Sequence, residues 1–313
     1  MKKFQSLWQQ LQAYENVILI PHIYPDGDAL GSTFGLQGLL QSYSTKQRVR
    51  VVGEHIQGTD WMGSFDVIPD DHWAKSAVVF LDTATKELVY SPNAFNASSS
   101  LLIDHHPKTT PFYDDSFIET TATSTSEILA RMAESLSLSM TPHTANCFLF
   151  GILHDTTVLT HPYVSTDTMH AVAYLIDQGA TYHEMQKSVL KQPIATLETI
   201  ATWRSKLQHT PRGLGYLFLT YDELADVQFP FNELFRQLRQ IMELQVVCLV
   251  VEKDNEFILH FQSDSINLHP LLQDFAGGGH AFASKVHVAT KKESYRVIET
   301  VDQLLQSPTR TLV

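Results

Sequence analysis

The sequence has little cysteine, few positive charges and no long hydrophobic run. Its only two cysteines, Cys147 and Cys248, lie in apolar runs, so we expect buried thiols and neither a disulfide nor a zinc site. The formal net charge of −12 argues against a protein that tracks long nucleic acid along a broad basic surface. No segment approaches the ~18 to 20 apolar residues of a membrane helix, and the first residues lack an apolar core of signal-peptide length. We therefore expect a cytoplasmic protein.

The remaining composition is that of a globular protein with room for two domains. The 313 residues are 43% hydrophobic and 18% charged, which is ordinary for a chain of this class. Short apolar runs at 16–21, 47–54, 76–84 and 100–106 alternate with helical patterns. This alternation predicts an α/β fold whose N-terminal domain is a doubly wound, mostly parallel sheet with helices on both faces.

The pattern changes after about residue 186. A polar, mostly helical segment follows, and then the strand-like runs "GLGYLFLTYDE", "LQVVCLVVEKD" and "EFILHFQSD" predict a second sheet. We therefore expect a catalytic domain of residues 1–186, a helical linker of residues 187–204 and a smaller α/β domain of residues 205–313. The active site is expected in the cleft between the two domains.

Acidic and imidazole side chains follow three of the predicted strands, in "PHIYPDGDALGS", "FLDT" and "LLIDHH". Because ligands of open parallel sheets bind outside the carboxyl ends of the strands, we expect these groups to converge on one edge. A further acid stands in "GILHDT", inside an otherwise apolar helix, where a buried carboxylate needs a partner or a cation. The side chains expected at this edge are those of His22, Asp26, Asp28, Asp82, Asp104, His105, His106 and Asp155.

Each of these acidic segments has a simpler interpretation when it is taken alone. "DGD" is typical of a turn, Asp82 could cap the next turn, "DHH" could be a surface cluster, and Asp155 could be a hydrogen-bonded core acid. A calcium loop is excluded, because Leu30 and Gln37 stand where an EF-hand needs an oxygen ligand and a glutamate. The coincidence of four such segments at four predicted element ends favours a metal site.

The type and number of candidate ligands indicate the metal and the reaction. Carboxylates with a minority of imidazoles and no thiolate suit Mn²⁺, or Mg²⁺, better than structural zinc. The set exceeds what one tetrahedral ion needs, so we expect two ions. Two metals about 3.5–4 Å apart are the usual clamp for in-line displacement at phosphorus. One carboxylate would then bridge the ions, and a shared water or hydroxide would be the nucleophile.

A glycine run, "FAGGGHAFAS", lies in the second predicted domain. Gly277, Gly278 and Gly279 would let backbone amides approach a phosphate or a base, and His280 follows directly. The run is neither a P-loop nor a dinucleotide fingerprint, and a flexible turn is its simpler interpretation. Ser263, in "HFQSDS", is a second candidate contact for a substrate.

Taken in order, "HIYPDGDALGS", "LDT", "IDHH" and "GILHDT" resemble the four motifs of the DHH phosphoesterases, and "GGGH" resembles the signature of the DHH-associated C-terminal domain. Size and domain pairing are similar to the nanoRNase and pAp-phosphatase branch. The resemblance implies hydrolysis of short oligonucleotides such as pApA to nucleoside 5′-monophosphates, and of the nucleoside bisphosphate pAp to AMP. From the net charge and the lack of long apolar runs, we expect no tracking of long nucleic acid and no membrane partner. We also consider a homodimer, because many soluble proteins are two-fold dimers.

The resemblance also implies a role for individual residues. The ligands of one Mn²⁺ would be His22, Asp26 and Asp82. The ligands of the other would be Asp28, Asp82, His105 and Asp155. Asp82 would thus bridge the ions, His106 would contact the scissile phosphate, and the glycine run with His280 would hold the far end of the substrate.

The sequence departs from the family pattern at two places. Gln262 precedes Ser263 where the family commonly has arginine, which removes a bidentate phosphate donor and questions the preference for a terminal phosphate. Thr157 stands where glycine is frequent, but the metal ligands are unaffected.

Three other functions fit parts of the sequence. An inorganic pyrophosphatase or exopolyphosphatase of the same superfamily would carry a basic Ser-Arg-Lys-Lys signature, and the sequence has none. A RecJ-like exonuclease on long single strands is disfavoured by the net charge of −12 and by the absence of an added nucleic-acid-binding domain. A non-catalytic nucleotide-binding protein would be expected to lack metal ligands, and none is missing.

Overall fold

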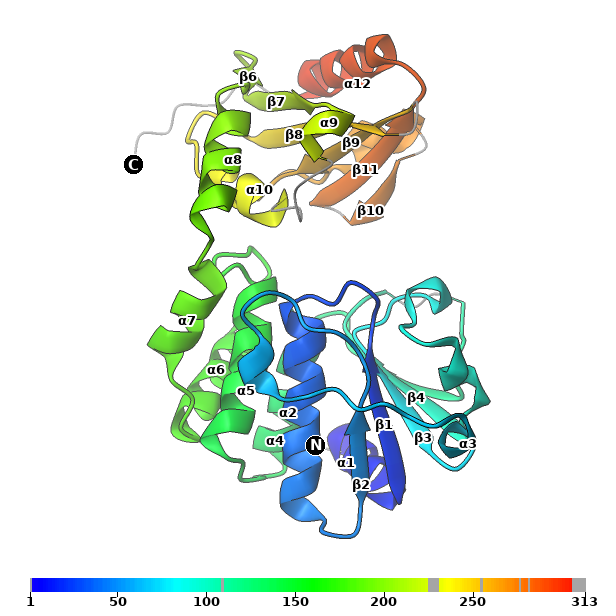
Figure 1. Cartoon of the computed structure of the whole chain (residues 1–313). Helices are drawn as coiled ribbons and strands as arrows, with labels where there is room; N and C mark the ends of the chain where they lie inside the picture. Colours follow the sequence, from blue (N-terminus) through cyan, green and yellow to red (C-terminus); the bar gives the residue numbers. More distant parts are fainter. Residues whose placement is uncertain are drawn as a thin grey trace. The chain divides into compact units, whose positions relative to one another are not determined.

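The computed structural model describes residues 2–107, 110–224, 231–253, 256–275, 277–280 and 282–305. The chain forms two compact units, Met1–Lys191 and Gln192–Val313, and each is an α/β sheet covered by helices. The ribbon in Figure 1 follows the chain from the N-terminal unit in blue to the C-terminal unit in yellow and red. The predicted fold class, a parallel N-terminal sheet followed by a smaller α/β unit, is confirmed.

The sheet of the N-terminal unit has five parallel strands in the order β2-β1-β3-β4-β5. The inner strands are short runs of branched apolar residues, buried on both faces as a parallel sheet requires. The last strand, "DSFI", was not predicted, because it contains only two apolar residues. The strands are β1 (Asn16–Pro21), β2 (Arg48–Val51), β3 (Ala77–Leu81), β4 (Ser99–Asp104) and β5 (Asp115–Ile118).

The helices of this unit begin at polar residues that cap them. Ser124, Thr141 and Ser165 each accept a bond from the amide three residues on, which satisfies one of the unpaired donors of a helix start. The α-helices are α1 (Lys2–Ala13), α2 (Gly27–Tyr43), α3 (Asp70–Trp73), α4 (Thr125–Ser135), α5 (Pro142–Asp155), α6 (Thr166–Asp177) and α7 (Tyr182–Leu190). The 3₁₀ turns are η1 (Asp60–Met62), η2 (Lys86–Leu88) and η3 (Pro92–Asn96).

The two faces of the parallel sheet are covered differently. Leu19 and Val79 face a large core built with the long helices α1, α2, α4 and α5. Their neighbours Ile18 and Phe80 face the other side, where Trp73 of α3 and the η3 turn complete a smaller core. Figure 1 shows α2, α4 and α5 on one side of the sheet and α3 on the other. Both faces are therefore closed, and ligands have access to this sheet only at its edges.

Helices α2 and α5 approach so closely that only glycine fits between them. A Cβ atom on Gly31 would lie 2.5 Å from the carbonyl oxygen of Cys147 and 2.9 Å from the Cα atom of Gly151. Asp26 and Asp28 lie at the N-terminus of α2, and Asp155 ends α5. The close crossing therefore helps to bring these acids together at one end of the sheet.

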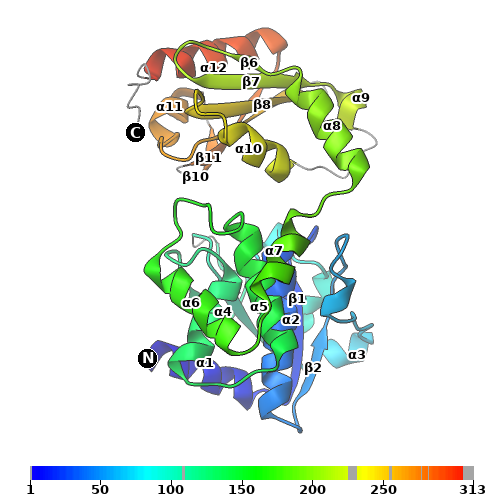
Figure 2. The ribbon, with the colours of Figure 1, turned by 90° about the vertical axis from the view of Figure 1, so that its left-hand side faces the viewer.

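The C-terminal unit is a six-stranded mixed sheet in the order β10-β11-β9-β8-β7-β6, parallel only between β7 and β8. Helix α12 packs on one face, and α8 and α10 pack on the other (Figure 2). The strands are β6 (Gln208–His209), β7 (Leu214–Leu219), β8 (Val246–Lys253), β9 (Glu256–Gln262), β10 (Gly278–His280) and β11 (Ala283–Val288). The helices are α8 (Ile194–Arg204), α9 (Tyr221–Leu224), α10 (Phe231–Arg239), α11 (His269–Leu272), η4 (Gln273–Phe275) and α12 (Lys291–Leu304).

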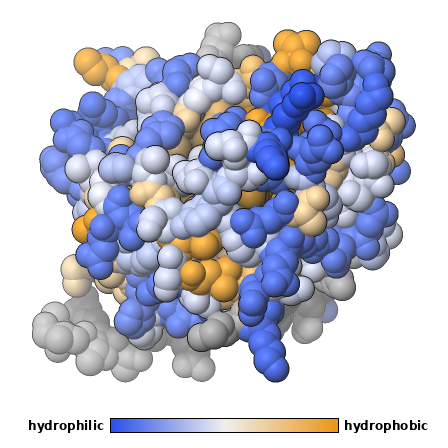
Figure 3. Space-filling model, turned by 90° about the horizontal axis from the view of Figure 1, so that it is seen from below, coloured by the Kyte–Doolittle hydropathy of each residue, from blue (hydrophilic) through white to orange (hydrophobic). Residues whose placement is uncertain are grey.

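Most of the predicted linker is helix α8, which packs on the second sheet through Ile200 and Trp203. Among the described residues, no helix combines the length and hydropathy needed to cross a membrane. In the view of Figure 3, hydrophilic residues predominate and hydrophobic ones form small scattered groups. The apolar residues of the chain are thus used mainly inside the two units.

The α2–α5 crossing gives a test of the packing. We expect Gly31→Ala to lower the free energy of unfolding by about 1–3 kcal/mol, because the new methyl group meets backbone atoms of α5 that cannot turn aside. In an open helix the same change would raise stability by up to about 1 kcal/mol. Urea unfolding followed by circular dichroism measures the difference. Ser42→Ala, at an exposed position of the same helix, is the control, and a Gly31→Ala variant as stable as the parent would contradict the close crossing.

Candidate metal centre

The first two candidate ligands lie in the loop between β1 and α2. His22 directly follows β1, and its Nδ1 atom lies 2.7 Å from the carbonyl oxygen of Ile23. If Nδ1 donates to that carbonyl, Nε2, which lies 3.7 Å from Asp82 Oδ2, carries the lone pair. Asp26 caps α2, and its Oδ1 atom accepts from the amides of Asp28 and Ala29 at 2.9 and 3.0 Å. Asp26 is therefore a helix cap, and the two amide bonds fix the direction of its carboxylate.

Asp28 is fully buried beneath the N-terminus of α4. Its two oxygens accept from the amides of Thr125 and Ser126 at 2.7 and 2.9 Å. The first amides of a helix have no partner within the helix, and its dipole favours negative charge there. This arrangement offsets part of the energy that burial of the carboxylate costs.

Asp82 follows β3 in a left-handed backbone conformation, with φ of 55°. Such a conformation is unfavourable for most residues other than glycine, although aspartate tolerates it better than bulky residues do. Its amide donates to Ile103, and Thr125 Oγ1 donates to its carboxylate at 3.2 Å. Non-glycine residues in this region often belong to functional sites, where the surrounding structure holds them in place.

The structure brings all six candidate ligands together at the carboxyl edge of the parallel sheet. Ligand atoms of each of two groups lie within 4.8 Å of one another. One group is His22, Asp26 and Asp82. The other is Asp28, His105 and Asp155. Two further groups with the same spacing add neighbours of these residues: Asp82, Asp104, His105 and His106; and Asp26, His154 and Asp155.

His105 shows that this cluster fits a cation. Its Nε2 atom lies 3.5 Å from Asp82 Oδ1 and 3.4 Å from Asp155 Oδ2, yet it is buried without a hydrogen-bond partner among the described residues. Burial also lowers the pKa of the imidazole, which keeps it neutral and able to donate its lone pair. A buried lone pair next to two carboxylates, in a set without thiolates, suits a divalent cation of the Mn²⁺ or Mg²⁺ type.

The carboxylates of the cluster repel one another. Burial raises the pKa of Asp28 well above its usual value, and the charges of Asp155 and Asp26 raise it further. The pKa of Asp82 is also raised, first by burial and then by the charges of Asp28, Asp26 and Asp155. Without a cation, burial and these charges therefore favour retention of a proton on each of the two acids, compared with the same acids in water. Binding of a divalent cation would release these protons.

Asp104 and His154 belong to the cluster, although the sequence did not identify them as ligands. Asp104 Oδ1 accepts from Nδ1 of His106 at 2.8 Å and from its amide at 3.0 Å. Burial alone would lower the pKa of His106, but these interactions with Asp104 outweigh it and raise the pKa. Asp104 therefore orients His106 and favours its charged form. Its position at the end of an apolar strand was the available signal.

His154 is the neighbour of Asp155 at the end of α5. Burial opposes a charge on its ring, but Asp155 and Asp26 outweigh burial and raise the pKa of His154 to about 9. In the absence of a metal, this imidazolium neutralises part of the acidic cluster. No sequence pattern indicated this role, because "HD" does not show which other acids surround the histidine.

The predicted substrate contacts other than His106 lie in the C-terminal unit. Ser263 is 2% exposed; its hydroxyl donates to the carbonyl of Gln245 at 2.8 Å and accepts from the amide of Ile266. Gly277 and Gly278 are exposed, and the end of the glycine run forms the edge strand β10, paired with β11. Gly279 and His280 belong to this strand, but the side chain of His280 lies outside the described part of the chain. Their contacts with a substrate stay predictions.

The N-terminal unit is thus a parallel α/β unit with a candidate metal centre of carboxylates and imidazoles at the carboxyl ends of its strands. Residues 16–152 match the family model described as "DHH family, N-terminal domain". Residues 16–152 therefore form a DHH family domain, and the resemblance to this family is confirmed.

Relatives with assigned names cover nearly the whole chain. A protein of Streptococcus mutans named "Probable bifunctional oligoribonuclease and PAP phosphatase NrnA" is 24% identical, over 98% of this chain and all of its own. The Bacillus subtilis protein named "Bifunctional oligoribonuclease and PAP phosphatase NrnA" is 22% identical, over 96% of this chain and 97% of its own. The crystal structure of an exopolyphosphatase-related protein from Bacteroides fragilis has the same fold, with a TM-score of 0.82, 19% identity and coverage of 97% and 96%.

Because the carboxylates of the cluster repel one another, we expect Asp82→Asn to stabilise the protein in the absence of metal and to weaken metal binding. In chelator at neutral pH, this variant should unfold at a higher temperature than the parent, by about 2–4 °C for each kcal/mol of repulsion removed. The gain should grow as the pH rises through the raised pKa of Asp82, and it should vanish in acid, where the parent residue is protonated as well.

Mn²⁺ or Mg²⁺ should then raise the unfolding temperature of the parent but not that of Asp82→Asn. Thermal unfolding in chelator and in metal, across a pH series, measures both effects. Asp177→Asn, which removes one charge from an exposed position at the end of α6, is the matched control. A lower unfolding temperature for Asp82→Asn in chelator would contradict the repulsion.

Proposed function

We propose that this protein is a metal-dependent phosphodiesterase that hydrolyses short oligonucleotides, such as pApA, to nucleoside 5′-monophosphates, and that it also hydrolyses pAp to AMP. The observation that carries the proposal is the gathering of all six candidate ligands at one sheet edge. The names of the relatives, which cover nearly the whole of this chain, support the choice of substrates.

We assign two metal sites to this cluster. His22 and Asp26 would hold one ion, Asp28, His105 and Asp155 would hold the other, and Asp82, which touches both groups, would bridge them. Two Mn²⁺ ions, or Mg²⁺, would supply Lewis-acid activation of water and of the scissile phosphate. The O and N donors of the cluster are compatible with either metal.

The protein's own groups would position the substrate and stabilise charge. His106, held by Asp104 and favoured in its protonated form, is suited to donate a hydrogen bond to a phosphoryl oxygen as negative charge develops there. The amides of α4 hold Asp28 and fix the direction of its carboxylate.

The C-terminal unit would supply the length limit. In our proposal, the far end of a short substrate is held by the glycine run and His280 of the C-terminal unit, and a long strand would clash. A homodimer and a cytoplasmic location stay predictions; size-exclusion chromatography with light scattering tests the first.

A substrate panel tests this activity. In Mn²⁺ we expect turnover of pApA, pAp and short RNA, a much lower rate on RNA many times longer, and no turnover in chelator. Asp82→Ala should lower every rate by at least about 100-fold, because the bridging position is lost. Asp177→Ala is the control.

Each alternative has its own outcome in this panel. Phosphate release from pyrophosphate without nucleotide cleavage would identify a pyrophosphatase instead. Equal rates on a dinucleotide and on long RNA would overturn the length limit. Tight nucleotide binding in Mn²⁺ without any turnover would identify a non-catalytic binding protein.

Position 262 tests the preference for a terminal phosphate. Gln262 is half-buried on β9, between Val247 of β8 and Ala283 of β11. We expect Gln262→Arg to raise kcat/KM for pAp by roughly tenfold, the usual scale of one charge-assisted hydrogen bond. Gln262→Lys restores the charge without the planar fork and should give a smaller gain. Unchanged kinetics in both variants would show that this side chain does not face the terminal phosphate.

A further inference from the structure

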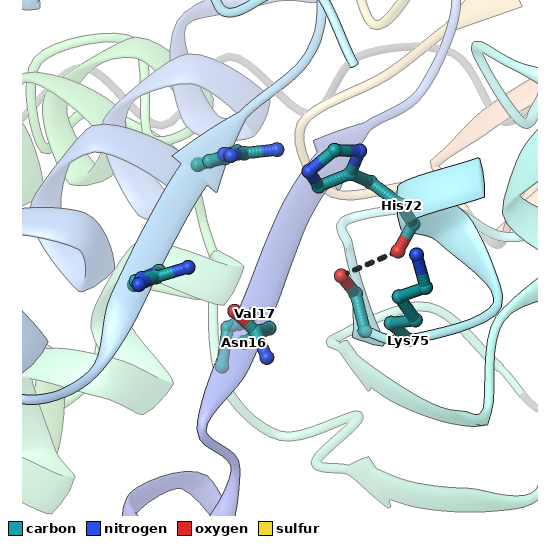
Figure 4. A pocket seen from close by; sticks show the side chains of 7 residues that line it. Asn16, Val17, His72 and Lys75 are labelled. Atoms are coloured by element: carbon teal, nitrogen blue, oxygen red, sulfur yellow. Dashed lines mark hydrogen bonds between the residues drawn. The ribbon is translucent and has the colours of Figure 1, made fainter. Parts of the chain in front are cut away.

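A pocket lies at the end of the parallel strands opposite to the acidic cluster. Residues at the starts of β1 and β2 and just before the start of β3 line it. Its volume is about 130 Å³. Figure 4 shows His72 and Lys75 beside the start of β1, where Asn16 is labelled. We call it the basic pocket, and the polar residues that line it are Asn16, Arg48, Arg50, His72, Lys75 and Ser76.

The basic pocket concentrates positive charge in a chain whose net charge is −12. Arg48 and Arg50 are two positions apart on β2, so both side chains lie on the same face of the strand. Neither guanidinium has an ion-pair or hydrogen-bond partner within the part of the chain that the structure describes. Arg50 is half-buried. Two adjacent unpaired arginines repel each other, and an anion between them would remove that repulsion.

The other side of the pocket is a short turn that ends α3. Lys75 Nζ lies 2.8 Å from Asp71 Oδ2, and His72 Nδ1 lies 3.1 Å from Asp71 Oδ1. These ion pairs are exposed to solvent, so they are weak and can exchange for a bound anion. Ser76 donates its hydroxyl proton to the carbonyl of His72 at 2.8 Å, the dashed line in Figure 4. This bond fixes the turn and leaves the cationic side chains as the donors of the pocket.

Protection of a sheet edge does not explain this arrangement. Strand β2 is the edge strand of its sheet, and basic residues on edge strands discourage pairing with other chains. That role would need only the residues of β2 itself. His72 and Lys75 come from a separate segment of the chain, more than twenty positions away, and they line the same pocket.

The size and donors of the pocket indicate the ligand class. A volume of 130 Å³ corresponds to roughly four waters at about 30 Å³ each. Pockets for drug-sized ligands are larger, about 300–1,000 Å³. A compact oxyanion fits this space, and arginine forks match phosphate oxygens in pairs. The rest of a phosphorylated molecule would have to lie outside.

We propose that the basic pocket is a second, non-catalytic binding site for a phosphate-type oxyanion, either inorganic or the phosphate end of a nucleotide. Strands β1 and β3 run from this pocket to His22 and Asp82 at the other edge. At about 3.3 Å per residue, five to six residues separate the two sites by roughly 17–20 Å. A phosphate in the basic pocket is therefore out of reach of the acidic cluster, and the site is distinct from the one that hydrolyses the substrate.

Calorimetric titration of the full chain in chelator tests this site. Chelator removes metal-dependent binding of anions at the acidic cluster, and the pocket variants show how much of the remaining binding belongs to the basic pocket. The probes are inorganic phosphate, pyrophosphate and AMP, each at low and at moderate salt. We expect saturable binding of one anion per chain that weakens as salt rises. In the double variant Arg48→Gln/Arg50→Gln, binding should be at least roughly tenfold weaker.

Matched variants separate the pocket from general charge effects. Lys291→Gln/Lys292→Gln removes the same charge from exposed positions of α12 and should leave the Kd within about twofold. Lys75→Gln, at an exposed position, supplies a second test if the arginine variant does not fold. Binding of pyrophosphate but not AMP identifies a free anion as the ligand, and equal binding of both identifies a phosphate end group.

Three results would overturn the proposal. They are the absence of saturable binding for every probe, an unchanged Kd in the folded arginine and Lys75 variants, and an equal loss of binding in the α12 control.

Discussion

Repulsion among buried carboxylates at the carboxyl edge of the parallel sheet is the constraint on which the structure of this site depends. Asp28 and Asp82 are almost completely buried, and their pKa values are raised by burial and by neighbouring acids. A fold retains such charges only where partners offset them. Amides of α4, the imidazolium of His154 and retained protons offset part of the charge. The carboxylate and imidazole groups of the cluster are also the kinds of ligand that a divalent cation of the Mn²⁺ or Mg²⁺ type needs.

The elements that hold these acids are rigid, and the reason is local in each case. Asp26 is a helix cap, Asp82 sits in a left-handed turn, and the glycines of α2 and α5 let the two helices cross at backbone contact. The parallel sheet also places opposite charges at the two ends of its strands. The acids gather where the strands end, and the basic pocket lies where they begin. Both follow from the common direction of the strands.

Sequence reasoning was accurate where one physical signal dominates. The prediction of a strand at 16–21 coincides with β1, because a run of branched apolar residues buried on both faces has few other solutions. Pro142 stands in the first turn of α5, a position that proline favours. Strand β5 was missed, since "DSFI" has too few apolar residues for a pattern, and its pairing with β4 depends on the sheet already being formed.

The sequence by itself determined the strand–helix alternation and the six ligand candidates, because apolar runs and the order of short acidic motifs are local properties of the chain. Only the tertiary structure decided what surrounds each of them. The roles of Asp104 and His154, the internal hydrogen bonds of Ser263 and the basic pocket all depend on which distant segments lie side by side. Burial and electrostatic interactions act through space, so no pattern along the chain specifies them.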